Sequence, residues 1–145
     1  MELTKEMIVL KQEITTKEEA IKKAGNLLVE NGCVDEAYVD AMFERNEMLS
    51  TYMGNFIAIP HGTDEAKKYV KKSGISVVQI PNGVRFGDDE DEKMTMMVFG
   101  ISGIGNEHLE ILQKIAIFCA DVENVVKLVS ANTEEEIISL LQEVE

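Results

Sequence analysis

The two histidines are the residues of this chain best suited to do chemistry. His61 follows a short apolar run and Pro60, while His108 follows a longer apolar run and a glycine-rich loop at 102–105. A neutral imidazole is nucleophilic near pH 7, because its ordinary pKa is about 6.5. It can accept a phosphoryl group, a transfer that needs positioning and donors aimed at the phosphoryl oxygens. Each histidine is predicted to lie at a strand-to-helix junction, where unpaired helix amides attract anions.

A purely structural role is the alternative to this one, because a histidine after a strand commonly caps a helix or fills a packing site. The spacing of His61 and His108 alone leaves both interpretations open. Two neighbours of His61 favour a reactive role. Gly62 has no side chain to obstruct a partner, and Pro60 stiffens the chain just before the imidazole.

The hydrophobic periodicity predicts helices and strands in alternation. A capping box at Thr16–Glu19 begins the first helix, which ends at Asn31–Gly32. The other predicted elements are a helix over 35–46, a strand over 55–59, a helix over 63–72, strands over 75–80, 84–86 and 93–101 with a turn at 81–83, and helices beginning near His108, Asp121 and Thr133. This order predicts a single-domain α/β sandwich over residues 1–145, with a mixed central β-sheet flanked by helices.

Composition restricts the function further. The net charge of −13 over 145 residues disfavours nucleic acid and anionic membrane surfaces as partners. It favours basic or neutral protein partners, although it can also serve solubility alone. No stretch reaches the roughly 18 apolar residues of a membrane span and no secretion signal is recognisable, so a cytoplasmic location is expected. Cys33 and Cys119 lack metal-ligand spacing and are read as reduced thiols; we predict no metal and no cofactor.

Five segments carry a resemblance to a known family, and two of them, residues 18–21 and 38–42, lie upstream of the others. Residues 50–63, which include Ile-Ala-Ile-Pro-His-Gly, strongly resemble the active-site segment of enzyme IIA domains of the sugar phosphotransferase system (PTS), fructose/mannitol type. Residues 83–87 with the acidic run after them, and residues 106–109, look like the mannitol branch. The similarity covers nearly the whole chain.

The resemblance implies a phosphocarrier. Such domains accept a phosphoryl group from phosphorylated HPr on the histidine of Pro-His-Gly, here His61. They pass it to a cysteine of enzyme IIB, which serves mannitol uptake in the mannitol branch. The IIB and membrane-embedded IIC partners are then expected as separate polypeptides, with no direct membrane insertion of this chain.

The resemblance also assigns further site residues. His108 is expected beside His61 and is expected to help bind the phosphoryl group, and Arg45 matches the family's arginine. Asn55 stands where some members carry a carboxylate, and it can form a hydrogen bond near His61. Phe56 replaces a residue that is commonly small, so it belongs either to the core or to a partner-binding surface.

Three alternatives stay open at this point. The chain can be a fructose-specific enzyme IIA, or a regulatory enzyme IIA-like domain whose phosphorylation state is read by another protein. From a different class, it can be a hydrolase or metal-binding module that uses His61, His108 and acidic residues.

Overall fold

The structure is a computed structural model and describes residues 3–88 and 90–142. Its centre is a five-stranded sheet in the order β1-β4-β5-β3-β2. The strands are β1 (Ile8–Val9), β2 (Tyr52–Gly54), β3 (Ile57–Ala58), β4 (Gly74–Arg85) and β5 (Met94–Ser102). The β1–β4 and β3–β5 pairs are parallel, whereas β2–β3 and β4–β5 are antiparallel. The predicted mixed sheet is thereby confirmed.

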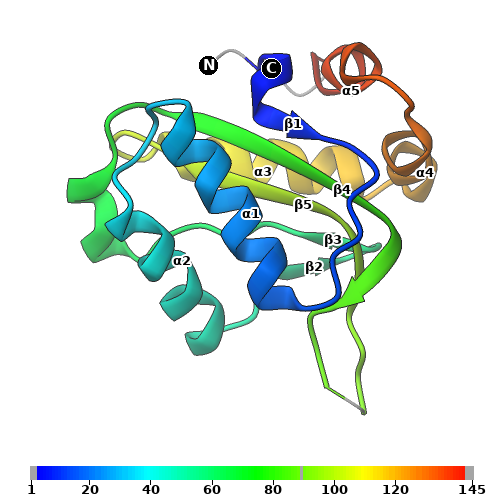
Figure 1. The fold of residues 1–145 in the computed structure, drawn as a ribbon, viewed down its shortest axis with the longest axis horizontal. Coiled ribbons are helices and arrows are strands. Elements are labelled where there is room, and N and C mark those ends of the chain that lie inside the picture. The colour runs from blue at the N-terminus through cyan, green and yellow to red at the C-terminus, as the bar shows by residue number, and fades with distance from the viewer. Residues whose placement is uncertain (1–2, 89, 143–145) are drawn as a thin grey trace.

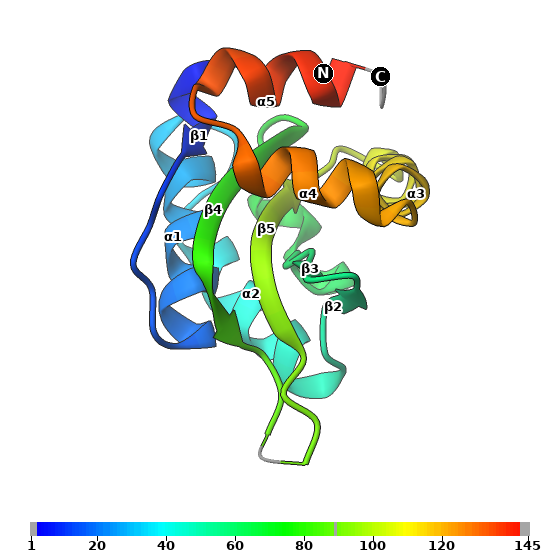
Figure 2. The same ribbon diagram turned by 90° about the vertical axis from the view of Figure 1, so that its right-hand side faces the viewer.

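Helices cover both faces of the sheet. The helical elements are η1 (Lys5–Met7), α1 (Lys17–Glu30), α2 (Ala37–Met48), η2 (Asp64–Tyr69), α3 (Glu107–Cys119), α4 (Val122–Ser130) and α5 (Glu134–Leu141). Helix α1 lies against β4 and β5, and α2 packs on α1 (Figure 1). In the turned view, α1 lies on one side of the sheet and α3 and α4 lie on the other (Figure 2). The sandwich architecture predicted from the sequence is confirmed.

The predicted helix starts are confirmed at three places. Thr16, Asp121 and Thr133 each accept a hydrogen bond from a backbone N–H of the helix they begin. These caps satisfy amides that would otherwise lack a partner. Both cysteines are buried free thiols, and burial raises the pKa of the Cys119 thiol to about 12.

The hydrophobic core lies between the helices and the two long strands β4 and β5. Val77, Val98, Phe99, Leu28 and Ile115 have no exposed surface. Within the described residues, no helix has the length and apolar character needed to cross a bilayer.

Three predicted elements differ from the structure. The turn predicted at 81–83 is wrong, because β4 runs through this segment as one strand up to Arg85. The register against β5 shifts between Gln79 and Val84, with Gly83 at a φ of 77°. A strand irregularity is a place where proline and glycine are tolerated, so the Pro-Asn-Gly sequence here bends a strand rather than ending it.

The other two differences flank His61. The predicted strand over 55–59 is shortened to Ile57–Ala58, because Asn55 and Phe56 form the turn between β2 and β3 with positive φ values of 48° and 68°. The predicted helix over 63–72 is a single 3₁₀ segment, Asp64–Tyr69. The expected α-helix N-terminus beside His61 is therefore absent from the described structure.

Candidate functional site

The first candidate residue, His61, is held against the end of strand β5. Its backbone forms an isolated parallel bridge with Ile101, and the Ile101 N–H donates to the Pro60 carbonyl at 3.0 Å. His61 is half-buried, and so is the neighbouring Gly62. The imidazole therefore has a fixed backbone on one side and access to solvent on the other.

A backbone contact assigns the tautomer of the His61 ring. Its Nδ1 lies 2.9 Å from the Ile59 carbonyl oxygen. A carbonyl oxygen only accepts hydrogen bonds, so Nδ1 carries the proton. The electron pair is then on Nε2, the nitrogen farther from the backbone, and that nitrogen is the nucleophile.

Burial, the largest influence, lowers the pKa of His61 from its ordinary value. The hydrogen bond to Ile59 opposes this shift, and the charge of Arg45 adds to it. A lowered pKa keeps the ring neutral at pH 7. Electrostatics and tautomer therefore agree on a nucleophilic Nε2.

His108 lies beside His61, as expected. The two ring centroids are 6.4 Å apart and the planes are tilted by 34°. His108 is the second residue of α3 and is half-buried. Its pKa is also lowered, mainly by burial and next by the charge of Lys67. A small tetrahedral group held between the rings can contact both.

The loop before His108 is tied to the segment that precedes β4. The Ser73 hydroxyl donates to a Glu107 carboxylate oxygen at 2.6 Å and accepts from the Ile104 N–H at 3.0 Å. These bonds fix the entry to α3 and thus the position of His108. Neither Ser73 nor Glu107 was predicted as a site residue. The one sequence signal for Glu107 was its place in the segment 106–109, which resembles the mannitol branch; Ser73 had none.

Arg45 reaches the same region from the last turn of α2. Its Nη1 donates to the Leu49 carbonyl at 2.8 Å, which satisfies one of the free carbonyls at the helix end. Burial is the main cause of the lowered His61 pKa, and the charge of Arg45 adds to that lowering. A guanidinium has five N–H donors, so this contact leaves others for an anion.

Asn55 is placed differently from the other three candidates. Its side-chain amide donates to the carbonyls of Cys119 and Ala120, at 3.0 and 3.2 Å. The hydrogen bond expected near His61 is not among the contacts of the described residues. Asn55 instead joins the β2–β3 turn to the C-terminal end of α3.

Apolar side chains are exposed on the segments that carry the site residues. Six of these side chains, which we call the apolar rim, are between 42% and 71% exposed: Met48, Leu49, Met53, Phe56, Ile104 and Leu109. They belong to the end of α2, the β2–β3 hairpin and the start of α3. Exposed apolar side chains on segments that carry a functional site are a feature of protein-binding surfaces.

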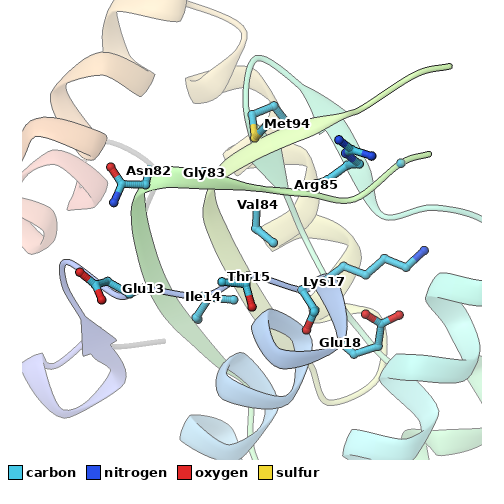
Figure 3. A pocket seen from close by; sticks show the side chains of 12 residues that line it. Glu13, Ile14, Thr15, Lys17, Glu18, Asn82, Gly83, Val84, Arg85 and Met94 are labelled. Atoms are coloured by element: carbon cyan, nitrogen blue, oxygen red, sulfur yellow. The ribbon is translucent and has the colours of Figure 1, made fainter. Parts of the chain in front are cut away.

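An open groove lies away from the histidine pair. It has a volume of about 760 Å³ and is lined by the segment before α1, the start of α1 and β4, including Glu13, Lys17, Asn82 and Arg85 (Figure 3). The lining carries charges of both signs. None of the four candidate residues contributes to it, so the histidine pair acts outside this groove.

The fold and site together define an α/β protein with a neutral, accessible imidazole beside a second imidazole and an arginine. The model of the family "Phosphoenolpyruvate-dependent sugar phosphotransferase system, EIIA 2" matches residues 1–144. The chain belongs to this family of enzyme IIA phosphotransferase components.

Relatives and solved structures agree with that membership. The mannitol-specific enzyme IIA component of Enterococcus faecalis is 60% identical over 135 residues, which is 93% of each chain. That of Geobacillus stearothermophilus is 58% identical over 142 residues, covering 98% of this chain and 96% of the relative. Among solved structures, the Escherichia coli complex of enzyme IIAMtl with phosphorylated enzyme IIBMtl matches with a TM-score of 0.92 and 39% identity, covering 98% of each chain.

Proposed function

We propose that this protein is the cytoplasmic enzyme IIA of a mannitol-type permease, and that His61 carries its phosphoryl group. The relatives at 58–60% identity support the mannitol branch. The observation that carries the chemistry is the contact between His61 Nδ1 and the Ile59 carbonyl, with the His108 ring beside it. This contact leaves Nε2 free to attack.

The proposed transfer follows from these groups. The electron pair of His61 Nε2 attacks the phosphorus of phospho-HPr. The new N–P bond forms while the bond to the donor histidine nitrogen breaks, and that electron pair leaves with the donor ring. The bond from Nδ1–H to Ile59 stabilises the positive charge that develops on the phosphorylated ring.

Two further residues act on the phosphoryl oxygens in this proposal. His108 supplies a ring nitrogen as a donor, and Arg45 turns its unused N–H groups toward the oxygens. Donors placed in advance around developing charge accelerate transfer, since they need no reorganisation during the reaction. A thiolate of enzyme IIB then attacks the phosphorus, and His61 leaves as a neutral imidazole.

The apolar rim is the proposed contact surface for HPr and enzyme IIB. Both partners must bring a phosphorylated side chain or a thiolate to the same imidazole, so they bind in turn. Partners used in turn require a surface that releases easily, and half-exposed methionine and leucine side chains adapt to different partners.

Labelling with phosphoenolpyruvate, HPr and the enzyme that phosphorylates HPr tests the proposal. The wild type is expected to take up one acid-labile phosphoryl group, and His61→Ala none. His108→Ala is the matched control, since it removes the other imidazole and leaves the nucleophile; it is expected to be labelled more slowly. Labelling of His61→Ala at the wild-type rate would reject His61 as the carrier.

The same labelled protein separates the alternatives. Transfer to a mannitol-type IIB, and not to a fructose-type IIB, is expected. Stable labelling with no transfer to either IIB would favour a regulatory domain. Rapid release of inorganic phosphate, or a bound metal in the purified protein, would favour the hydrolase or metal-binding alternative.

A further inference from the structure

The backbone around His61 is joined to β5 in an unusual way. In a parallel ladder with His61 opposite Ile101, the Ile101 N–H pairs with the Pro60 carbonyl and the Gly62 N–H pairs with the Ile101 carbonyl. The first bond is present at 3.0 Å. In place of the second, the Gly62 N–H donates to the Tyr38 hydroxyl at 2.9 Å, and that hydroxyl donates to the Ile101 carbonyl at 2.7 Å.

Tyr38 is well placed to hold this link. It lies in the first turn of α2 and is only 4% exposed. Its ring packs directly against Gly62, where an added Cβ would come within 2.5 Å of a Tyr38 ring carbon. Burial raises the pKa of the Tyr38 phenol to about 12, so the hydroxyl keeps the proton it donates to Ile101 at any physiological pH.

The Tyr38 hydroxyl sets the spacing between the backbone at Gly62 and strand β5 at Ile101. Two hydrogen bonds in series separate Gly62 from Ile101, where a direct ladder bond spans about 2.9 Å. His108 is held by a separate set of bonds, through Ser73 and Glu107. The distance between the two imidazoles therefore depends on the link at Gly62.

We propose that Tyr38 is a positioning residue for phosphoryl transfer, because its hydroxyl sits in the ladder beside His61 and holds that imidazole at its working distance from His108. The inference rests on the proposed role of His61. Tyr38 also lies seven residues before Arg45, on the same face of α2. One helix thus fixes both the backbone of the nucleophile and a guanidinium near it.

A core-filling role is the simpler alternative for Tyr38, and phenylalanine separates the two. Tyr38→Phe keeps the ring and removes only the hydroxyl. Gly62 and Ile101 must then pair directly or lose their partner, and either change moves the segment that carries His61. Displacement of a reacting group by a fraction of an ångström is enough to slow a positioned transfer.

The experiment measures the rate of labelling by phospho-HPr and the ¹⁵N resonances of the His61 ring. Tyr38→Phe is expected to fold, to be labelled about tenfold more slowly, and to lose the single Nδ1–H tautomer signal. Tyr69→Phe is the matched control and is expected to behave as wild type, because the described structure gives its hydroxyl no hydrogen bond. A Tyr38→Phe protein with wild-type rate and wild-type His61 signals would overturn the proposal.

Two further measurements keep the result decisive. If the wild type itself is not labelled, the proposed function fails, while the tautomer signals of Tyr38→Phe still test the positioning claim. If Tyr38→Phe does not fold, amide exchange of the wild type decides. Slow exchange at Gly62 relative to Thr63 supports the Tyr38 link, and equally fast exchange at both amides overturns it.

Discussion

Gly103 lies directly beneath the backbone of His108, so closely that any Cβ on Gly103 would overlap the His108 amide nitrogen. This contact fixes where α3 starts relative to β5. The atom in the way belongs to the backbone, so the helix start would have to move to admit a side chain. The smallness of Gly103 is therefore part of the geometry of the histidine pair.

Gly103→Ala is expected to separate His108 from His61. The added methyl forces the first turn of α3 outward, which weakens the second imidazole's contact with the phosphoryl group. Labelling by phospho-HPr should slow about as much as in His108→Ala. Gly105→Ala is the control for a general effect on the loop: a Cβ there meets no atom within 4 Å, although its φ of 62° adds strain. Wild-type labelling of folded Gly103→Ala would contradict this account.

The titration of His61 should show a pKa below the ordinary value. Burial is the main cause, and Arg45 contributes. We propose ¹⁵N-edited NMR between pH 4 and 8, a range that spans the ordinary histidine pKa of about 6.5. The His61 ring is expected to stay neutral, with its proton on Nδ1, at every pH above that ordinary value. Arg45→Met should raise the pKa of His61, whereas Lys127→Met, which removes an exposed charge from α4, should leave it unchanged. An unchanged pKa in Arg45→Met would remove Arg45 from the site.

The lowered pKa of His61 also predicts the direction of the stability change with pH. The folded state binds the proton more weakly than the unfolded chain, so the unfolded chain gains protons first as the pH falls. The free energy of unfolding should decrease as the pH drops below about 6.5 and level off below the folded pKa. His108, whose pKa is also lowered, contributes with the same sign. Urea unfolding of wild type and of His61→Gln at several pH values measures the share of His61.

Much of this fold was predictable because its signals are local. The capping residues Thr16 and Thr133 mark helix starts by sequence alone, and the apolar run before Ser102 has a strand-like pattern that β5 confirms. The same locality explains the errors. The two-residue strand Ile8–Val9 is defined by its partner β4 rather than by its own pattern.

The candidate site was predictable only in part, for the same reason. His61 and His108 stand out by residue type, and the family resemblance adds Arg45. The bonds of Tyr38 connect residues that are 24 and 63 positions apart, so no local pattern reveals them. The resemblance also placed Asn55 near His61, but Asn55 lies in the β2–β3 turn with a left-handed φ of 48°. Its side-chain amide donates to the carbonyls at the end of α3.

Asn55→Ala is expected to reduce stability without altering His61. The substitution removes the donor to the carbonyls of Cys119 and Ala120, and one net hydrogen bond contributes about 1 kcal/mol. Asn55→Asp should be at least as destabilising, because a carboxylate cannot donate to a carbonyl. Urea unfolding measures the loss of stability in both variants. The NMR titration of His61 tests whether its pKa stays unchanged. A shifted His61 pKa with unchanged stability would return Asn55 to the site.

Phe56→Gly should separate fold stability from partner binding. Phe56 has a φ of 68° and follows Asn55 at 48°, the pair of positive values that a two-residue hairpin turn requires. A left-handed conformation is costly for a residue with a Cβ and free for glycine, so the substitution is expected to stabilise the protein by about 1 kcal/mol. Its side chain is 42% exposed, so the packing lost with the buried part of the ring offsets some of this gain.

The effect on transfer should have the opposite sign. Phe56 belongs to the apolar rim, and its removal is expected to raise the concentration of HPr or IIB needed for half-maximal transfer while leaving the maximal rate near that of wild type. Met53→Gly is the matched control, because it removes a neighbouring exposed side chain, 49% exposed, from a strand residue that is not among those with positive φ. It should weaken partner binding in the same way but lower the stability, since glycine within a strand costs about 0.5–1 kcal/mol. Equal losses of stability in both variants would show that the turn carries no strain at Phe56.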